Sequence, residues 1–185
     1  MKIQPKIIEG LRNSETVLYP TDTIWGLGCD ATNDDACQKI LEIKNRPENK
    51  SFILLVDSWP MLERYVPDFH EVCYDLDDYA SKPLTIIYPN ARDLAPSVLA
   101  EDGSVGIRLT KDPICLSLIR SMRKPLVSTS ANLSGEPSPT CYDDVADSIK
   151  ENVDHIVKER LSEKRTKASQ IIKIGLNGEV KIIRS

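Results

Sequence analysis

The stretch that decides the fold reads PLVSTSANLSGEPSPT and runs from Pro125 to Thr140. It opens as a short apolar strand and continues, without a break, into hydroxyl and amide side chains. Polar groups gathered at a strand end are where α/β folds commonly bind ligands. Ser, Asn, Gly and Pro are also ordinary loop residues, so a simple connection has the same composition. Because Ser128, Ser130 and Asn132 alternate, an extended backbone would point all three to one face, which favours a binding site.

The composition bounds the class of protein. The 185 residues are 41% hydrophobic and 28% charged, which predicts one globular domain spanning 1–185. A net charge of −4 argues against a global basic field for nucleic acid. The five cysteines lack metal-ligand spacing, and we expect reduced, mostly buried thiols. No segment reaches the length of a membrane span and the N-terminus lacks a long apolar run, so we expect a cytoplasmic protein without a membrane partner.

Apolar periodicity and turn signals divide the chain into alternating elements. We expect helices over 4–12, from the cap at Asn33 to about 43, over 58–66 and 68–80, from the cap at Asp112, and over 142–150. We expect strands over 16–19, 52–56, 84–88, 104–109, 125–127, 154–157, 169–174 and 179–183. This alternation predicts an α/β fold with helices flanking a twisted mixed sheet that ends in an antiparallel C-terminal pair.

Two further polar stretches flank predicted strands. PTDTIWGLG, residues 20–28, places hydroxyls and glycines after the first strand, but neither a GxGxxG fingerprint nor a P-loop is present. KNRPENK, residues 44–50, follows a helix and precedes a strand. Two explanations of its cations are about equally well supported. They complement the C-terminal end of a helix and are solvated, or they form a phosphate-binding loop. Arg108 lies inside an apolar strand and must meet an anion, either a ligand or a structural salt bridge.

The available side chains restrict the chemistry. A serine hydrolase needs a histidine base, and the chain has two histidines and no GxSxG elbow. Ser128, Ser130 and Ser134 are therefore better hydrogen-bond partners than nucleophiles. A site of cations, hydroxyls and an amide suits phosphates, a small polar substrate and a transferring phosphoryl group.

Six motifs, in this order, closely resemble those of the YrdC/TsaC family of threonylcarbamoyl-AMP synthases: YPTDTIWGLGCDA, KNRPENKSFILLV, KPLTIIYP, SVGIRLT, STSANLSGEPSPT and KASQIIKI. The resemblance implies a single YrdC-like domain with a concave, positively charged cavity. It also implies formation of threonylcarbamoyl-AMP and pyrophosphate from L-threonine, bicarbonate or CO2, and ATP. Mg2+ would accompany the ATP phosphates, with no protein metal site and no tightly bound cofactor. Partner proteins would then transfer the threonylcarbamoyl group to tRNA position 37, and tRNA itself is a possible partner.

The resemblance also assigns site residues, motif by motif. The expected catalytic cations are Lys44 and Arg46. The residues expected to contact ATP are Lys44, Arg46, Lys50, Ser104, Ser130, Asn132, Ser138 and Arg184. The residues expected to contact L-threonine are Thr23, Arg108, Ser128 and Ser169. The sequence departs from the family pattern at Leu55, where some longer members have a histidine, at 81–83, where PGP is more usual, and at 168–170, where PST or PSE is more usual.

Two other functions fit parts of the pattern. The same domain occurs in hydrogenase maturation proteins, but those are long chains with zinc-finger and acylphosphatase segments that this sequence has no room for. The second is a non-catalytic module that binds double-stranded RNA or tRNA. The net negative charge and an aromatic content of 5% disfavour RNA binding as the main role.

Overall fold

A computed structural model describes residues 3–45 and 52–185. Its helices are α1 (Pro5–Arg12), α2 (Asp34–Ile43), α3 (Trp59–Tyr65), α4 (Val72–Asp78), α5 (Pro113–Met122) and α6 (Asp147–Asn152), with a 3-10 turn η1 (Pro96–Val98). Its strands are β1 (Val17–Tyr19), β2 (Gly26–Gly28), β3 (Ile53–Val56), β4 (Leu84–Tyr88), β5 (Val105–Leu109), β6 (Leu126–Ser130), β7 (His155–Ile156), β8 (Gln170–Ile174) and β9 (Val180–Arg184).

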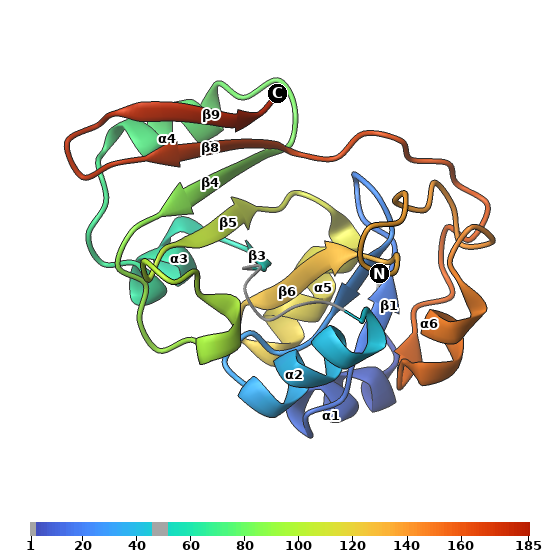
Figure 1. The fold of residues 1–185 in the computed structure, drawn as a ribbon. Coiled ribbons are helices and arrows are strands. Elements are labelled where there is room, and N and C mark those ends of the chain that lie inside the picture. Colours follow the sequence, from blue (N-terminus) through green and yellow to red (C-terminus); the bar gives the residue numbers. More distant parts are fainter. Residues whose placement is uncertain (1–2, 46–51) are drawn as a thin grey trace.

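The strands form one mixed sheet in the order β7-β1-β2-β6-β3-β5-β4-β8-β9 (Figure 1). The pairs β1–β7, β3–β5 and β4–β8 are parallel, and the other neighbours are antiparallel. The α/β fold and the antiparallel C-terminal pair predicted from the sequence are therefore confirmed. β7 and β8 are consecutive in the chain but lie far apart in the sheet, so residues 157–169 run from one side of the sheet to the other (Figure 1).

A hydrophobic core lies on each face of the sheet because neighbouring strand residues point to opposite faces. Val17 and Tyr19 pack with α1 and α5, whereas Leu18 packs on the other face with α2. In the same way, Leu55 of β3 packs in the core with α1 and α5, and Leu54 packs in the core with α2. The helices thus form two layers that hold the sheet between them.

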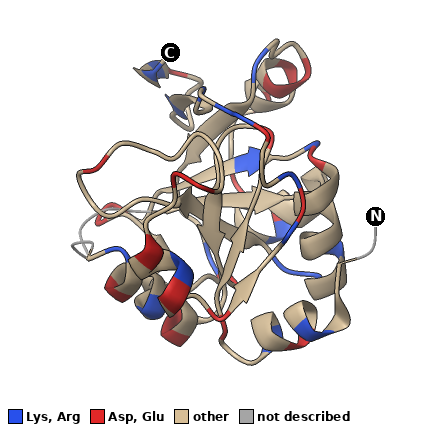
Figure 2. Cartoon of the chain, turned by 90° about the vertical axis from the view of Figure 1, so that its right-hand side faces the viewer, with Lys and Arg blue, Asp and Glu red and all other residues tan. Residues whose placement is uncertain are grey.

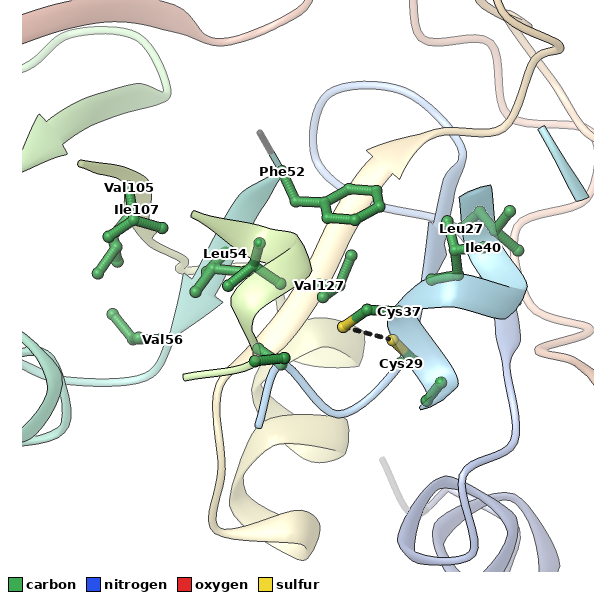
Figure 3. Close-up of a cluster of buried hydrophobic side chains, with 14 of the residues drawn as sticks. Leu27, Cys29, Cys37, Ile40, Phe52, Leu54, Val56, Val105, Ile107 and Val127 are labelled. Carbon is green, nitrogen blue, oxygen red and sulfur yellow. Dashed lines mark hydrogen bonds between the residues drawn. The ribbon is translucent and has the colours of Figure 1, made fainter. Parts of the chain in front are cut away.

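The core under α2 contains a close pair of thiols (Figure 3). The sulfur atoms of Cys29 and Cys37 lie 3.7 Å apart, beside Val127 and Phe52. Burial raises the pKa of the Cys29 thiol. All five cysteines are buried and free, as expected from their spacing.

Two helix starts were predicted from capping residues and are confirmed. The Asn33 side chain accepts a hydrogen bond from the Ala36 amide at 3.0 Å. The Asp112 carboxylate accepts from the amides of Ile114 and Cys115 at 2.8 and 3.1 Å. These bonds satisfy amide groups that have no partner within the first helical turn.

The strand β2 was not predicted. Its three residues, two of them glycines, were assigned to a polar connection, but they form a buried strand between β1 and β6. A Cβ atom at Gly28 would lie 2.1 Å from the carbonyl oxygen of Val127, so only glycine allows this approach of the chains. Helices α4 and α6 are also shorter than expected at 68–80 and 142–150. At α6, the Asp144 carboxylate instead accepts from the Thr140 amide and holds a turn.

Basic and acidic residues are interspersed along the helices (Figure 2). Within residues 3–45 and 52–185, no helix combines the length and the apolar composition needed to cross a bilayer.

Candidate functional site

A cavity of about 220 Å³ lies where the ends of several strands meet. The loop between β1 and β2, the start of β2, the strands β3, β5 and β6, the residues before β8 and the last residue of β9 all contribute to its wall. Seven of the twelve residues expected from the sequence line it: Thr23, Arg108, Ser128, Ser130, Ser138, Ser169 and Arg184.

Strand β6 supplies the floor of hydroxyls. Ser128 and Ser130 both line the cavity, as their alternation predicts. Ser130 lies opposite Gly26 of β2, and Ser128 lies opposite Ile53 of β3, so neighbouring strands place these residues side by side. Asn132 lies beyond the end of the strand and does not line the cavity. Its amide nitrogen donates to two carbonyl groups of the following loop, at 2.8 Å each.

Arg108 on β5 is one of two cations in the described lining. Its side chain is only 5% exposed, and its Nη1 atom lies 3.1 Å from Oδ1 of Asp22. The distance fits a hydrogen bond, but the angles do not, and within the described chain neither of these two buried atoms has a hydrogen-bond partner. We therefore treat the contact as an ion pair without a hydrogen bond. The Nη1 donor facing Asp22 remains unsatisfied.

Arg184, at the end of β9, is the second cation. Its Nε donates to the carbonyl oxygen of Ser169 at 2.9 Å, and its terminal nitrogen lies 3.4 Å from the Ser169 hydroxyl. That hydroxyl is also 2.8 Å from the buried hydroxyl of Thr85. Burial and the nearby charge of Arg108 lower the pKa of Arg184. Two guanidinium groups that affect each other in this way form a site that an anion would stabilise.

Thr23 is held by a local hydrogen-bond network. The hydroxyl of Thr21 accepts from the amide of Thr23 at 2.9 Å and donates to the carbonyl of Ile24 at 2.7 Å. The hydroxyls of Thr21 and Thr23 lie 2.9 Å apart. Because the Thr21 proton is already used, Thr23 donates in this contact and presents lone pairs to a ligand.

Lys44 is buried behind the end of β6 and does not line the cavity. Its ammonium group donates to the carbonyl oxygens of Ser130 and Asn132, and its own carbonyl accepts from the Ser134 amide at 2.9 Å. Lys44 therefore joins α2 to the loop that follows β6.

The other expected residues lie elsewhere. Ser104 donates to Asp102 at 2.5 Å and does not line the cavity. Arg46 and Lys50 lie outside the described residues. Within residues 3–45 and 52–185, no group of three or more His, Cys, Asp or Glu side chains is placed to hold a metal ion.

Sequence reasoning missed the apolar part of the wall. Ile24, Trp25, Ile53 and Ala168 line the cavity beside the hydroxyls. Trp25 packs against Tyr142 with ring centroids 5.3 Å apart. Such residues look like ordinary core in a sequence, although a tryptophan beside the Thr21–Thr23 hydroxyls was an available signal.

Comparison with known proteins identifies the family. Residues 9–185 match the model of the Sua5/YciO/YrdC domain, whose description is "Telomere recombination". The chain belongs to the Sua5/YciO/YrdC family. This confirms the resemblance carried by the six motifs, most of which lie on strands of the sheet or on the loops that follow them.

Individual members of the family are also similar to this chain. Threonylcarbamoyl-AMP synthase of Pseudoalteromonas translucida is 33% identical, over 92% of this chain and 91% of the relative. The Vibrio campbellii protein of the same name is 32% identical, over 92% and 94%. The crystal structure of P. abyssi Sua5 complexed with L-threonine superposes with a TM-score of 0.80 at 27% identity. That match covers 91% of this chain and 50% of the P. abyssi protein, so this chain spans half of its length.

Proposed function

We propose that this protein is an L-threonylcarbamoyladenylate synthase, a nucleotidyltransferase that forms threonylcarbamoyl-AMP and pyrophosphate. Its substrates would be L-threonine, bicarbonate or CO2, and ATP. The observation that carries the proposal is the cavity itself, where Arg108 and Arg184 meet a set of hydroxyl groups. Relatives that are 32–33% identical over most of the chain carry the name threonylcarbamoyl-AMP synthase and support the same reaction.

The proposed reaction needs no nucleophile from the protein. The ammonium group of threonine first loses a proton to solvent, and the neutral amine attacks the carbon of CO2. The new nitrogen–carbon adduct then loses a second proton to solvent and becomes a carbamate. A carbamate oxygen then attacks the α-phosphorus of ATP, and the bond from that phosphorus to the bridging oxygen breaks to release pyrophosphate. The protein has to hold the substrates in line and stabilise the charge that develops. A wall of guanidinium and hydroxyl groups provides both functions.

Each side chain has a proposed part in this reaction. Arg108 would bind the threonine carboxylate, and the lone pairs of Thr23 would accept hydrogen bonds from the threonine amine or hydroxyl. Ser128 and Ser169 would complete this pocket. The complex of P. abyssi Sua5 with L-threonine supports an amino-acid site in this fold.

The nucleotide would lie toward the end of β6. Ser130, Ser138 and Arg184 line the cavity and would contact ATP, with Arg46 and Lys50 on the phosphates. Lys44 would position the loop after β6, which it holds through the carbonyls of Ser130 and Asn132. Once ATP is present, its ammonium group would bind the phosphates directly. Asn132 would shape this loop, and Ser104 would have to contact ATP from outside the cavity. Mg2+ would arrive with ATP and neutralise phosphate charge.

The product implies further partners. Threonylcarbamoyl-AMP is a mixed anhydride, so a transferase must consume it, and we propose the proteins that modify tRNA position 37. We propose a cytoplasmic location, where ATP and tRNA are both available.

The first experiment measures pyrophosphate release from ATP and Mg2+ with L-threonine and bicarbonate, each present or omitted. We expect release that requires both. Pyrophosphate release that continues unchanged when threonine or bicarbonate is omitted would contradict the proposal. Salt-sensitive binding of double-stranded RNA, without any turnover, would favour the RNA-binding function instead.

A further inference from the structure

Asp22 lies directly behind the wall of the cavity. Its Oδ1 atom is 3.1 Å from Nη1 of Arg108, which lines the cavity. Asp22 itself lines a neighbouring hollow of about 210 Å³, together with Asp77, Lys82 and Lys111. The described lining of the cavity contains no aspartate or glutamate. Asp22 is therefore the acidic group that directly contacts a cation of the site without lining the site.

The contact between Asp22 and Arg108 acts through charge. Within the described chain, neither Oδ1 of Asp22 nor Nη1 of Arg108 has a hydrogen-bond partner, although both atoms are buried. Asp22 therefore does not occupy an N–H direction of the guanidinium group. An arginine side chain has five donors in a fixed plane, and a ligand in the cavity can still be bound by them. What Asp22 supplies is a negative charge close to them.

This charge changes which ligands the cavity favours. A simple anion beside Arg108 and Arg184 is attracted by two positive charges, and it is repelled by the carboxylate behind them. A zwitterion carries an ammonium group as well, so the same carboxylate attracts one end of it while repelling the other. The two facing atoms, Oδ1 of Asp22 and Nη1 of Arg108, are buried, which strengthens both effects, although a third of the Asp22 side chain is exposed to solvent and screens part of its charge.

We propose that Asp22 is a specificity-determining residue, which makes the cavity prefer a zwitterionic amino acid to a simple carboxylate or an inorganic anion. The inference rests on the proposed function, in which L-threonine is the ligand. Asp22 acts through the electric field and through its contact with Arg108.

The test compares two ligands that differ in one group. L-Threonine and 3-hydroxybutyrate share the carboxylate, the hydroxyl and the methyl group, but 3-hydroxybutyrate has no amine. Binding of each to the full chain is measured by calorimetry without ATP. For Asp22→Asn we expect 3-hydroxybutyrate to bind about tenfold more tightly, since one adjacent charge changes an ionic equilibrium by about that factor or more. Binding of L-threonine should change by less than about twofold, because the two effects on a zwitterion oppose each other.

Three further variants separate charge from shape. Asp77→Asn removes a charge from the same hollow without touching Arg108, and it should leave the ratio of the two affinities unchanged. Asp22→Glu keeps the charge and should preserve the wild-type preference. Asp22→Ser is a smaller neutral variant that provides the same test as Asp22→Asn, with folding checked by thermal unfolding.

The outcomes separate the two proposals. Intact threonine binding with an unchanged ratio in both neutral variants would overturn the inference and leave the proposed function standing. An equal shift in Asp77→Asn would overturn it as well, because the effect would then not depend on the contact with Arg108. Absence of threonine binding to the wild-type protein would overturn the proposed function and, with it, the inference.

Discussion

Replacing Arg108 by lysine keeps a positive charge opposite Asp22 but removes the planar fork that can bind a carboxylate through two parallel hydrogen bonds. A hydrogen bond to a charged group contributes about 1.5–3 kcal/mol, so the loss of one should raise the KM for L-threonine about 10- to 150-fold. The KM for ATP should change little. The assay is pyrophosphate release with each substrate varied in turn.

The same substitution predicts a modest effect on folding. Because Arg108→Lys leaves Asp22 with a cation, the free energy of unfolding should fall by less than about 2 kcal/mol. Arg108→Ala leaves the carboxylate unpaired. Since that carboxylate is about one-third exposed, we expect a loss near the lower end of about 3–5 kcal/mol. Arg92→Lys, an exposed arginine away from the cavity, is the matched control. A threonine KM within twofold of wild type in folded Arg108→Lys would refute the assignment of this side chain to the carboxylate.

Three further predictions concern stability. Gly28→Ala places a Cβ atom 2.1 Å from the carbonyl oxygen of Val127, and the strands must shift, so urea unfolding should show a loss of about 1–3 kcal/mol. Lys44→Met removes the buried donor to the carbonyls of Ser130, at the end of β6, and Asn132, in the following loop, and should cost about 1–3 kcal/mol in the same assay. Hydrogen bonds from Lys173 and Ser104 hold the pKa of Asp102 well below its usual range. Stability from this group is present above the usual value near 3.9 and is lost as pH falls through the lowered value, so Asp102→Asn should flatten the acid limb of stability against pH.

Each of the three stability predictions has a control variant or an outcome that would contradict it. Gly106→Ala adds a Cβ atom whose nearest neighbour lies at 3.4 Å, an ordinary contact, so it should cost clearly less than Gly28→Ala. Equal losses at the two glycines would show that chain approach at Gly28 is not the cause. Wild-type stability of Lys44→Met would mean that the loop carbonyls find other partners. An acid limb as steep in Asp102→Asn as in the wild type would contradict the effect of the Lys173 contact.

The sequence predicted the parts of the structure that depend on local patterns. The alternation of Ser128 and Ser130 placed both hydroxyls on the cavity side of β6, since the strand period is two. The caps at Asn33 and Asp112 fixed two helix starts, because the capping bonds span three residues or fewer. Arg108 was recognised because a cation in an apolar strand needs an anion nearby.

Contacts between distant segments could not be predicted in this way. Arg184 reaches the cavity because β8 pairs with β4 and β9 pairs with β8, and no local pattern encodes that register. The strand at Gly26–Gly28 was missed because Gly28 reflects close approach to Val127 of β6, a strand distant in the chain. Ser104 and Asn132 carry the expected side chains, but a local aspartate and the loop carbonyls hold them outside the cavity wall.

The connection between β7 and β8 limits how the sheet can change shape. Between Ile156 and Gln170 it crosses seven strand spacings, about 34 Å along the sheet, with a reach when fully extended of about 46–50 Å. Its middle is fixed at two points, where Tyr142 donates to the carbonyl of Leu161 and Arg165 donates to the carbonyl of Thr140. The connection therefore sets an upper limit on the distance between β7 at one end of the sheet and β8 near the other. Lengthening it should be tolerated. Removing four residues would leave a fully extended reach of about 33–36 Å, with no slack over the span of about 34 Å, so the connection could not keep its two hydrogen-bonded points.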